Sequence, residues 1–220
     1  MRSFDEIFAI AAERHGGAAA LKAKLSRPLP PKEIAALPED RWLSGMTQRV
    51  FSAGFNWKVI EAKWDGFETA FHGFNVDKCA MMNDEWLDQL LTDTRIVRNG
   101  SKIQSVRDNA VFIQELRDDG GIGKVFSEWS GEKYIDLLAL LKSRGSRLGG
   151  TSGQYFLRFA GVDSFILSSD VTARLVTEGV VDKAPTSKRA LQATQDAFNK
   201  WASESGRSLT EISRVLAMSV

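Results

Sequence analysis

The sequence predicts an all-α protein. Apolar residues recur at helical spacing along most of the 220 residues, and no stretch shows the sustained period-two alternation of a half-buried strand. Two segments have the spacing of a helix-capping box, Ser3-Phe-Asp-Glu6 and Ser208-Leu-Thr-Glu211. Hydrophobic content of 43% and charged content of 26% are ordinary for a globular protein, and the chain is long enough to bury a substantial core.

The helices expected in the first half of the chain follow from apolar spacing and from proline and glycine signals. A helix from Ser3 ends before Gly16-Gly17, and Pro31 stands at a first helical position behind a stiff proline-rich connector. Between residues 38 and 53, Trp42, Met46 and Val50 share one helical face. The other helices expected in this half span residues 18–25, 56–70, 76–82 and 84–92.

The second half continues the same pattern. Residues 101–116 form an amphipathic helix, and Gly120-Gly121 after it predicts a boundary between two helical lobes with a cleft between them. Further helices are expected at 133–142, 154–160, 171–178 and 187–205, followed by one that opens at Ser208.

Charge and cysteine content indicate the expected partners and compartment. The net charge of +1 argues mildly against nucleic acid as a partner, although basic residues can be concentrated on one face. Cys79 is a lone cysteine, which excludes an internal disulfide and suits a reducing cytosol. The sequence has neither a signal peptide nor an apolar run long enough for a membrane span. We therefore expect a cytoplasmic protein without a membrane partner.

A glycine-rich turn at Leu148-Gly-Gly-Thr-Ser-Gly153 joins two short apolar helices. So few connecting residues require a hairpin, and glycines suit it because they accept positive φ. Backbone N–H groups at the start of the second helix can bind an anion such as a DNA phosphate. Asp170 follows ten residues after that helix, at the start of another helical segment. A phosphate-binding turn followed by a carboxylate at a fixed distance along the chain suggests an enzyme that acts on a nucleotide.

This hairpin resembles that of the helix-hairpin-helix DNA glycosylases, and Asp170 falls where that superfamily has its catalytic aspartate. Upstream segments are similar to DNA-3-methyladenine glycosylase I. The resemblance implies one glycosylase domain over residues 1–220, built of two helical lobes with a cleft, with the helix-hairpin-helix at about 133–160. The upstream segments are Ala53-Gly-Phe-Asn-Trp-Lys58, Phe71-His-Gly-Phe, residues 94–104 and Asp108-Asn-Ala110.

The resemblance also implies roles for individual residues. Asp170 would stabilise positive charge on the sugar and position water, although an aspartate there could also cap the helix 171–178. Trp57 matches a tryptophan that lines the family's base pocket, where aromatic rings attract a cationic alkylated purine. Phe51 and Trp42 are candidate pocket neighbours, with core packing as the favoured alternative; for Trp57 the two roles are balanced.

DNA contacts are expected at the hairpin and at two upstream residues. The hairpin backbone at Gly150, Thr151, Ser152 and Gly153 would hold a phosphate, supported by Lys102. Phe55 is a candidate wedge for the gap that a flipped base leaves.

The chain departs from the family pattern at several positions. Arg49 stands where the family has a glutamate that contacts the base, and a cation there would repel a cationic base. Cys79, His15 and His72 lack the spacing of the family's zinc site, so neither metal nor organic cofactor is implied. Residues 162–166 contain no lysine for a Schiff base, which favours simple hydrolysis.

The sequence therefore predicts a monomeric, monofunctional DNA glycosylase of base excision repair. Its partner would be double-stranded DNA containing damaged bases, here alkylated purines such as 3-methyladenine. A nucleoid-associated location in a prokaryote would follow. Three alternatives remain open: a glycosylase for a different lesion, a non-catalytic helix-hairpin-helix DNA-binding protein, and a helical protein-interaction protein.

Overall fold

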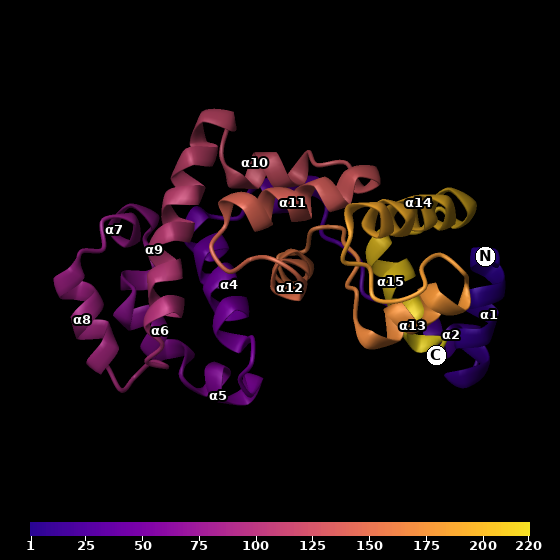
Figure 1. Cartoon of the computed structure of the whole chain (residues 1–220), viewed down its shortest axis with the longest axis horizontal. Helices are drawn as coiled ribbons and strands as arrows, with labels where there is room; N and C mark the ends of the chain where they lie inside the picture. Colours follow the sequence, from indigo (N-terminus) through magenta and orange to yellow (C-terminus); the bar gives the residue numbers. More distant parts are fainter. The chain divides into compact units, whose positions relative to one another are not determined.

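The protein is helical throughout, as the sequence predicts. The computed structural model describes all residues, 1–220, and contains α-helices and short 3-10 helices but no strand (Figure 1). The chain forms two compact units. Unit 1 comprises residues 1–29, 129–137 and 161–220, and unit 2 comprises residues 30–128 and 138–160. No helix combines the length and the apolarity that a bilayer span requires.

Unit 2 is built around α4 (Glu39–Ser52), which packs against α9 (Gly100–Glu115) and α12 (Thr151–Phe159). Its core is strongly aromatic: Trp42 of α4 meets Phe126 and Phe156 edge-on, with ring centroids 5.3 and 5.9 Å away. The remaining helices of this unit are α3 (Pro31–Ala35), α5 (Trp57–Ala62), α6 (Trp64–Ala70), η1 (His72–Phe74), α7 (Val76–Ala80), α8 (Asp84–Thr92), η2 (Leu116–Asp119) and α10 (Ile122–Ser127).

Two expectations about this region were wrong. The single helix expected over 56–70 is broken at Lys63 (φ −101°, ψ 4°), so that α5 ends and α6 begins there. The Gly120-Gly121 pair was expected to mark the boundary between two helical lobes, and it does not. Both glycines have positive φ and form the turn between η2 and α10 inside unit 2.

Unit 1 joins segments that are far apart in the sequence. In it, α1 (Phe4–Arg14) packs against α2 (Ala18–Lys22), α14 (Lys188–Ser205) and α15 (Leu209–Met218), and α15 also packs against α13 (Ser169–Thr177). Both predicted capping boxes are present, at Ser3 and at Ser208. The unit also contains η3 (Gly131–Lys133), and its boundary with unit 2 passes through α11 (Tyr134–Arg144).

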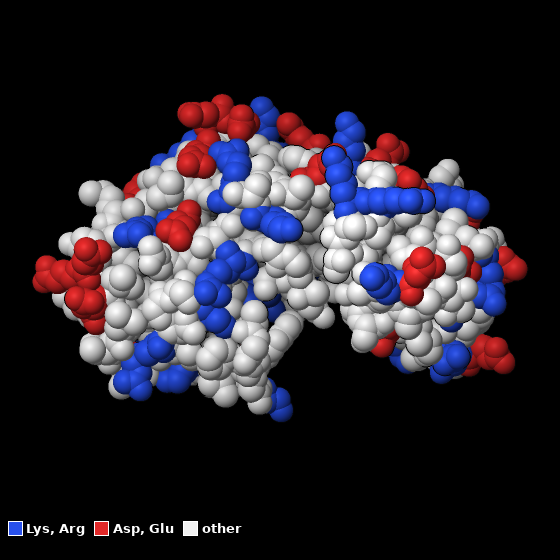
Figure 2. Space-filling model, in the orientation of Figure 1, with Lys and Arg blue, Asp and Glu red and all other residues white.

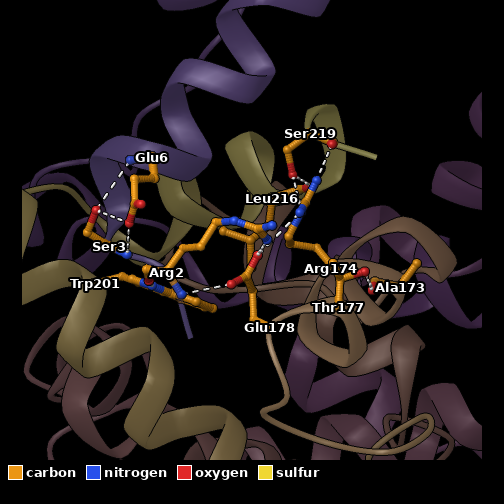
Figure 3. A network of polar contacts seen from close by, with 10 residues as sticks. All are labelled: Arg2, Ser3, Glu6, Ala173, Arg174, Thr177, Glu178, Trp201, Leu216 and Ser219. Carbon is orange, nitrogen blue, oxygen red and sulfur yellow. Dashed lines mark hydrogen bonds and ion pairs between the residues drawn. The ribbon is translucent and has the colours of Figure 1, made fainter.

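A partly buried ionic network holds α13 within unit 1 (Figure 3). The carboxylate of Glu178, at the C-terminal end of α13, accepts hydrogen bonds from the backbone N and the Nη1 of Arg2, both at 2.8 Å. It also accepts one from Nη1 of Arg174 at 3.2 Å. Arg174 in turn donates from Nε to the hydroxyl of Ser219 at 2.8 Å, and from Nη2 to the Ser219 carbonyl. Residues near positions 2 and 219 are thereby linked to the same helix.

Candidate functional site

A cavity of about 230 Å³ lies where the C-terminal end of α4 meets the N-terminal end of α12. All the residues that line it belong to unit 2. It therefore brings together several positions that the sequence singled out, although they are up to about a hundred residues apart in the chain. The lining residues are Arg49, Ser52, Ala53, Gly54, Phe55, Trp57, Thr151, Ser152 and Tyr155.

Aromatic rings form one wall of this cavity. Trp57 is the first residue of α5, and the Asn56 side chain caps that helix by accepting a hydrogen bond from the Lys58 amide at 3.0 Å. The Trp57 ring meets Tyr155 edge-on with centroids 5.6 Å apart, and it also meets Phe159 at 5.9 Å. Because Trp57 remains 38% exposed, it is not simply a core residue. The ring can offer a stacking surface to a flat ligand.

Arg49 is buried against the same rings. Only 7% of the residue is exposed, and its Cζ lies 4.9 Å from the ring centroid of Trp57 and 4.2 Å from that of Phe159. Its Nη2 donates to the side-chain oxygen of Gln48, whereas the buried Nε and Nη1 have no hydrogen-bond partner. Burial lowers the pKa of Arg49, and the charge of Glu61 opposes that shift. The guanidinium is nevertheless charged at any working pH.

The hairpin between α11 and α12 borders the cavity through Thr151 and Ser152. Gly150 precedes α12 with φ 60°, and no side chain caps this helix, so its first amide N–H groups have no side-chain acceptor. Of the three glycines in the hairpin, Gly150 has positive φ, whereas Gly149 and Gly153 do not. Gly153 is required for a different reason: a Cβ there would lie 2.3 Å from the Leu148 carbonyl oxygen.

Lys102 does not support the hairpin as the sequence suggested. The residue is 6% exposed, and its Nζ donates to the carbonyl oxygens of Ala53 at 2.6 Å and Phe51 at 3.2 Å. The ammonium also lies 4.6 Å from the ring centroid of Phe55. Burial, with the charge of Arg147, lowers the pKa of Lys102. Lys102 therefore fixes the α4–α5 loop that lines the cavity, and it is not a free cation for DNA.

Two other candidates for the pocket belong to the core instead. Trp42 is 1% exposed among Phe126 and Phe156, and Phe51 is fully buried against Phe67 with centroids 4.7 Å apart. Neither side chain lines the cavity. Phe55, in contrast, is exposed at the cavity rim, and its wedge role stays a prediction.

Asp170 lies in unit 1, on the first turn of α13. The capping residue of that helix is Ser168, whose hydroxyl accepts from the Val171 amide at 3.2 Å, so the alternative that Asp170 itself is the cap was wrong. The exposed Asp170 carboxylate accepts one hydrogen bond from the Ser169 hydroxyl at 3.3 Å. Asp170 is therefore not engaged in capping and lies on the first turn of α13.

The sequence reading missed Tyr155 and Phe159. They lie four residues apart on α12, so they share one face of that helix, with ring centroids 6.4 Å apart. Two aromatic residues four positions apart, on the helix that follows the hairpin, could have indicated an aromatic surface next to the cavity. Tyr155 lines the cavity beside Trp57, and Phe159 packs on the guanidinium of Arg49.

Charged side chains are unevenly distributed over unit 2. On the face shown in Figure 2, acidic residues gather over α8, which carries Asp84, Glu85 and Asp88, whereas Lys and Arg lie over the hairpin loop and the adjacent part of α9. Arg147 of that loop donates from Nη2 to the Ser101 hydroxyl of α9 at 2.7 Å. Basic side chains thus gather at the hairpin loop, which leads into the helix start that borders the cavity.

Sequence comparison matches this region to one family. Residues 39–137 match the model of the methyladenine glycosylase family. The chain is 31% identical over 68 residues to DNA-3-methyladenine glycosylase 1 of Escherichia coli (strain K12). That match covers 31% of this chain and 36% of the relative, so it spans about a third of the relative's length.

Solved structures share the fold. A 3-methyladenine DNA glycosylase I variant in complex with 3-methyladenine superposes with a TM-score of 0.53 at 19% identity, covering 66% of this chain and 86% of the other. The 3-methyladenine DNA glycosylase I from Staphylococcus aureus gives 0.52 at 20% identity, covering 70% and 92%. The chain therefore shares the fold of 3-methyladenine DNA glycosylase I, and over residues 39–137 its sequence matches the methyladenine glycosylase family.

Proposed function

We propose that this protein is a monofunctional DNA glycosylase that hydrolyses the N-glycosidic bond of modified purines in base excision repair. The observation that carries the proposal is the aromatic cavity beside the uncapped start of α12, in a fold shared with 3-methyladenine DNA glycosylases. Its partner would be double-stranded DNA containing damaged bases. A monomer that works in the cytoplasm, at the nucleoid, fits this role.

The groups of unit 2 supply binding in this proposal. Trp57 and Tyr155 offer ring faces and edges to a base that has left the helical stack. The first amides of α12, at Thr151, Ser152 and Gly153, hold a backbone phosphate by hydrogen bonds and by the helix dipole. Phe55, exposed at the rim, fills the gap in the duplex.

Asp170 supplies the charge that the reaction needs. As the bond between C1′ and the base nitrogen breaks, its electron pair leaves with the base and the sugar becomes cationic. A carboxylate stabilises such a cation electrostatically. Water then forms the new bond at C1′; one of its protons neutralises the departing base, and the sugar keeps a hydroxyl. No lysine stands at residues 162–166 to form a Schiff base, so hydrolysis is the proposed outcome.

The test is release of purines from methylated duplex DNA, analysed by chromatography, for the native protein and Asp170→Asn. We expect the native protein to release base and the variant to lose about 100- to 1,000-fold in rate, the effect of removing one charge-stabilising group. Asp5→Asn is a matched control, since Asp5 also lies on the first turn of a helix capped by serine. Duplex affinity should be the same for all three proteins.

Two results would contradict the proposal. Equal rates for Asp170→Asn and the native protein would remove Asp170 from the chemistry. Tight duplex binding without release from any lesion would favour a non-catalytic DNA-binding protein, an alternative that the cation at Arg49 favours. Absence of duplex binding even at low salt would reject both, because phosphate contacts are strongest there.

A further inference from the structure

We infer that the cavity binds a neutral 6-oxopurine, a base with a carbonyl oxygen at position 6 beside N7, and that Arg49 selects it. This inference rests on the proposed function and names the substrate class of the same site. Hypoxanthine is the simplest such base. Three features support this assignment: the charge of the cavity wall, the partnerless donors of Arg49 and the exposure of the rings around it.

The cavity wall offers positive charge and hydrogen-bond donors and has no carboxylate. Its lining includes one guanidinium, hydroxyl groups and the amide end of α12, and none of its side chains is acidic. The acidic charge that acts on Arg49 is that of Glu61, an exposed residue outside the lining. A cationic purine would therefore meet repulsion from Arg49, with no carboxylate to offset it. A neutral base with acceptor atoms would meet attraction.

Arg49 has donors that nothing in the protein satisfies. The residue is 7% exposed, and its Nε and Nη1 are buried without an acceptor. A buried donor without a partner is costly, and a ligand that supplies an acceptor removes that cost. Guanine-type bases present O6 and N7 as adjacent acceptors that a guanidinium binds in a bidentate manner. One edge of the Arg49 guanidinium would do so, with Nη2 and one of the two partnerless nitrogens as donors, because Nη2 carries a second hydrogen besides the one it gives to Gln48. Adenine presents an amino donor at position 6, which the guanidinium cannot bind.

Access to these donors requires side chains to rotate. Trp57 and Phe159 cover the guanidinium, and both rings keep exposed faces, at 38% and 61% exposure of the residue. Neither ring is fixed in the core, so either can turn to admit a flat ligand. Trp57 would then exchange its contact with Arg49 for stacking on the base.

The decisive measurement is calorimetric titration of the protein with free hypoxanthine and free adenine, which share a shape and differ at position 6. We expect hypoxanthine to bind about 10- to 100-fold more tightly, as one bidentate arginine pair discriminates between bases. Arg49→Met should abolish that preference while keeping the fold, checked by thermal unfolding. Arg41→Met, which removes an exposed arginine from the same helix, should keep it.

Several results would overturn the inference. Equal or tighter binding of adenine would do so, as would the absence of binding for both bases. A preference for hypoxanthine that survives Arg49→Met would remove Arg49 from recognition.

Base release from duplexes with a single lesion separates this inference from the proposed function. Release of 3-methyladenine but not hypoxanthine, unaffected by Arg49→Met, would reject the 6-oxopurine and keep the glycosylase. Release of no base, together with an Arg49-dependent preference for hypoxanthine, would keep the binding site and reject the glycosylase. Release of hypoxanthine that depends on both Arg49 and Asp170 is the expected result.

Discussion

The Nζ atom of Lys102 lies 2.6 Å from the carbonyl oxygen of Ala53, just beyond the C-terminal end of α4. A lysine of α9 thus supplies the donor for carbonyl groups that the end of a helix leaves free. The same ammonium reaches the carbonyl of Phe51 and the ring of Phe55. This one side chain determines how the chain leaves α4 and approaches Trp57.

Lys102→Met should therefore destabilise the folded protein and leave the α4–α5 loop, which lines the cavity, less firmly held. Loss of charged hydrogen bonds at buried carbonyls should lower the free energy of unfolding by about 1–3 kcal/mol. The measurement is denaturant unfolding, with the exposed Lys58→Met as the control. Unchanged stability of Lys102→Met would show that these carbonyls find other donors.

Gly153→Ala should disrupt the hairpin, because its new Cβ would lie 2.3 Å from the Leu148 carbonyl oxygen. The backbone must move, at a cost of about 1–3 kcal/mol. Duplex affinity should fall as well, since the first amides of α12 move with it. Gly149→Ala is the matched control: its Cβ would meet nothing nearer than 3.5 Å, and its φ is ordinary. Similar losses in both variants would refute the steric argument.

Glu178→Gln should destabilise unit 1. It leaves Arg174 buried without its counter-charge, and breaking one partner of such a pair costs about 3–5 kcal/mol. The exposed pair of Arg144 and Glu115 provides the comparison, since Glu115→Gln should cost about 0–1 kcal/mol. Thermal unfolding of both variants measures the difference, and equal effects would show that burial is irrelevant here.

The Glu178 carboxylate should also make the free energy of unfolding depend on pH in the acid range. Burial alone would raise the pKa of Glu178, but hydrogen bonds from Arg2 and Arg174 outweigh it and lower the pKa below its ordinary value of 4.5. The unfolded state then binds more protons near that pH, so this contribution is present above pH 4.5 and is lost as the pH falls through the lowered folded value. Glu178→Gln should lose part of its acid sensitivity.

Cys79 should be inert in the native protein. Burial raises the pKa of its thiol to about 12, from an ordinary value of 9.0. A thiol reagent at pH 8 should therefore modify Cys79 only after denaturation. Above pH 9 the unfolded thiol ionises while the buried one does not, so the free energy of unfolding should decrease between pH 9 and about 12. Cys79→Ala should lack this decrease, and rapid modification of the native protein would contradict the argument.

Local signals in the sequence predicted local structure well. The capping boxes at Ser3 and Ser208 and the proline that opens α3 are all present, because each depends only on neighbouring residues. The break at Lys63 was missed because Trp57, Ile60, Trp64 and Phe67 continue one helical face across it. The spacing of apolar residues cannot reveal a break in a helix when the same apolar face continues on both sides of the break.

Tertiary contacts were harder to predict. Trp42 and Trp57 each belong to a row of apolar residues at helical spacing, yet one is core and the other lines the cavity. The difference depends on which helices cover them, which spacing does not reveal. Lys102 was read as a surface cation because a lysine usually is one, whereas its partners are about fifty residues earlier. Arg49 was noticed through a family resemblance, not through any local pattern.

The composition of unit 1 has a consequence for biosynthesis. Residues 1–29 are translated before unit 2, but the helices that complete their unit, α13, α14 and α15, follow residue 160. All of unit 2 is translated before that point, so the cavity beside Arg49 and Trp57 can form on a nascent chain while α1 still lacks α15. The carboxylate of Asp170 acquires its folded setting last. A chain interrupted during translation would thus hold the pocket without the group proposed to do the chemistry.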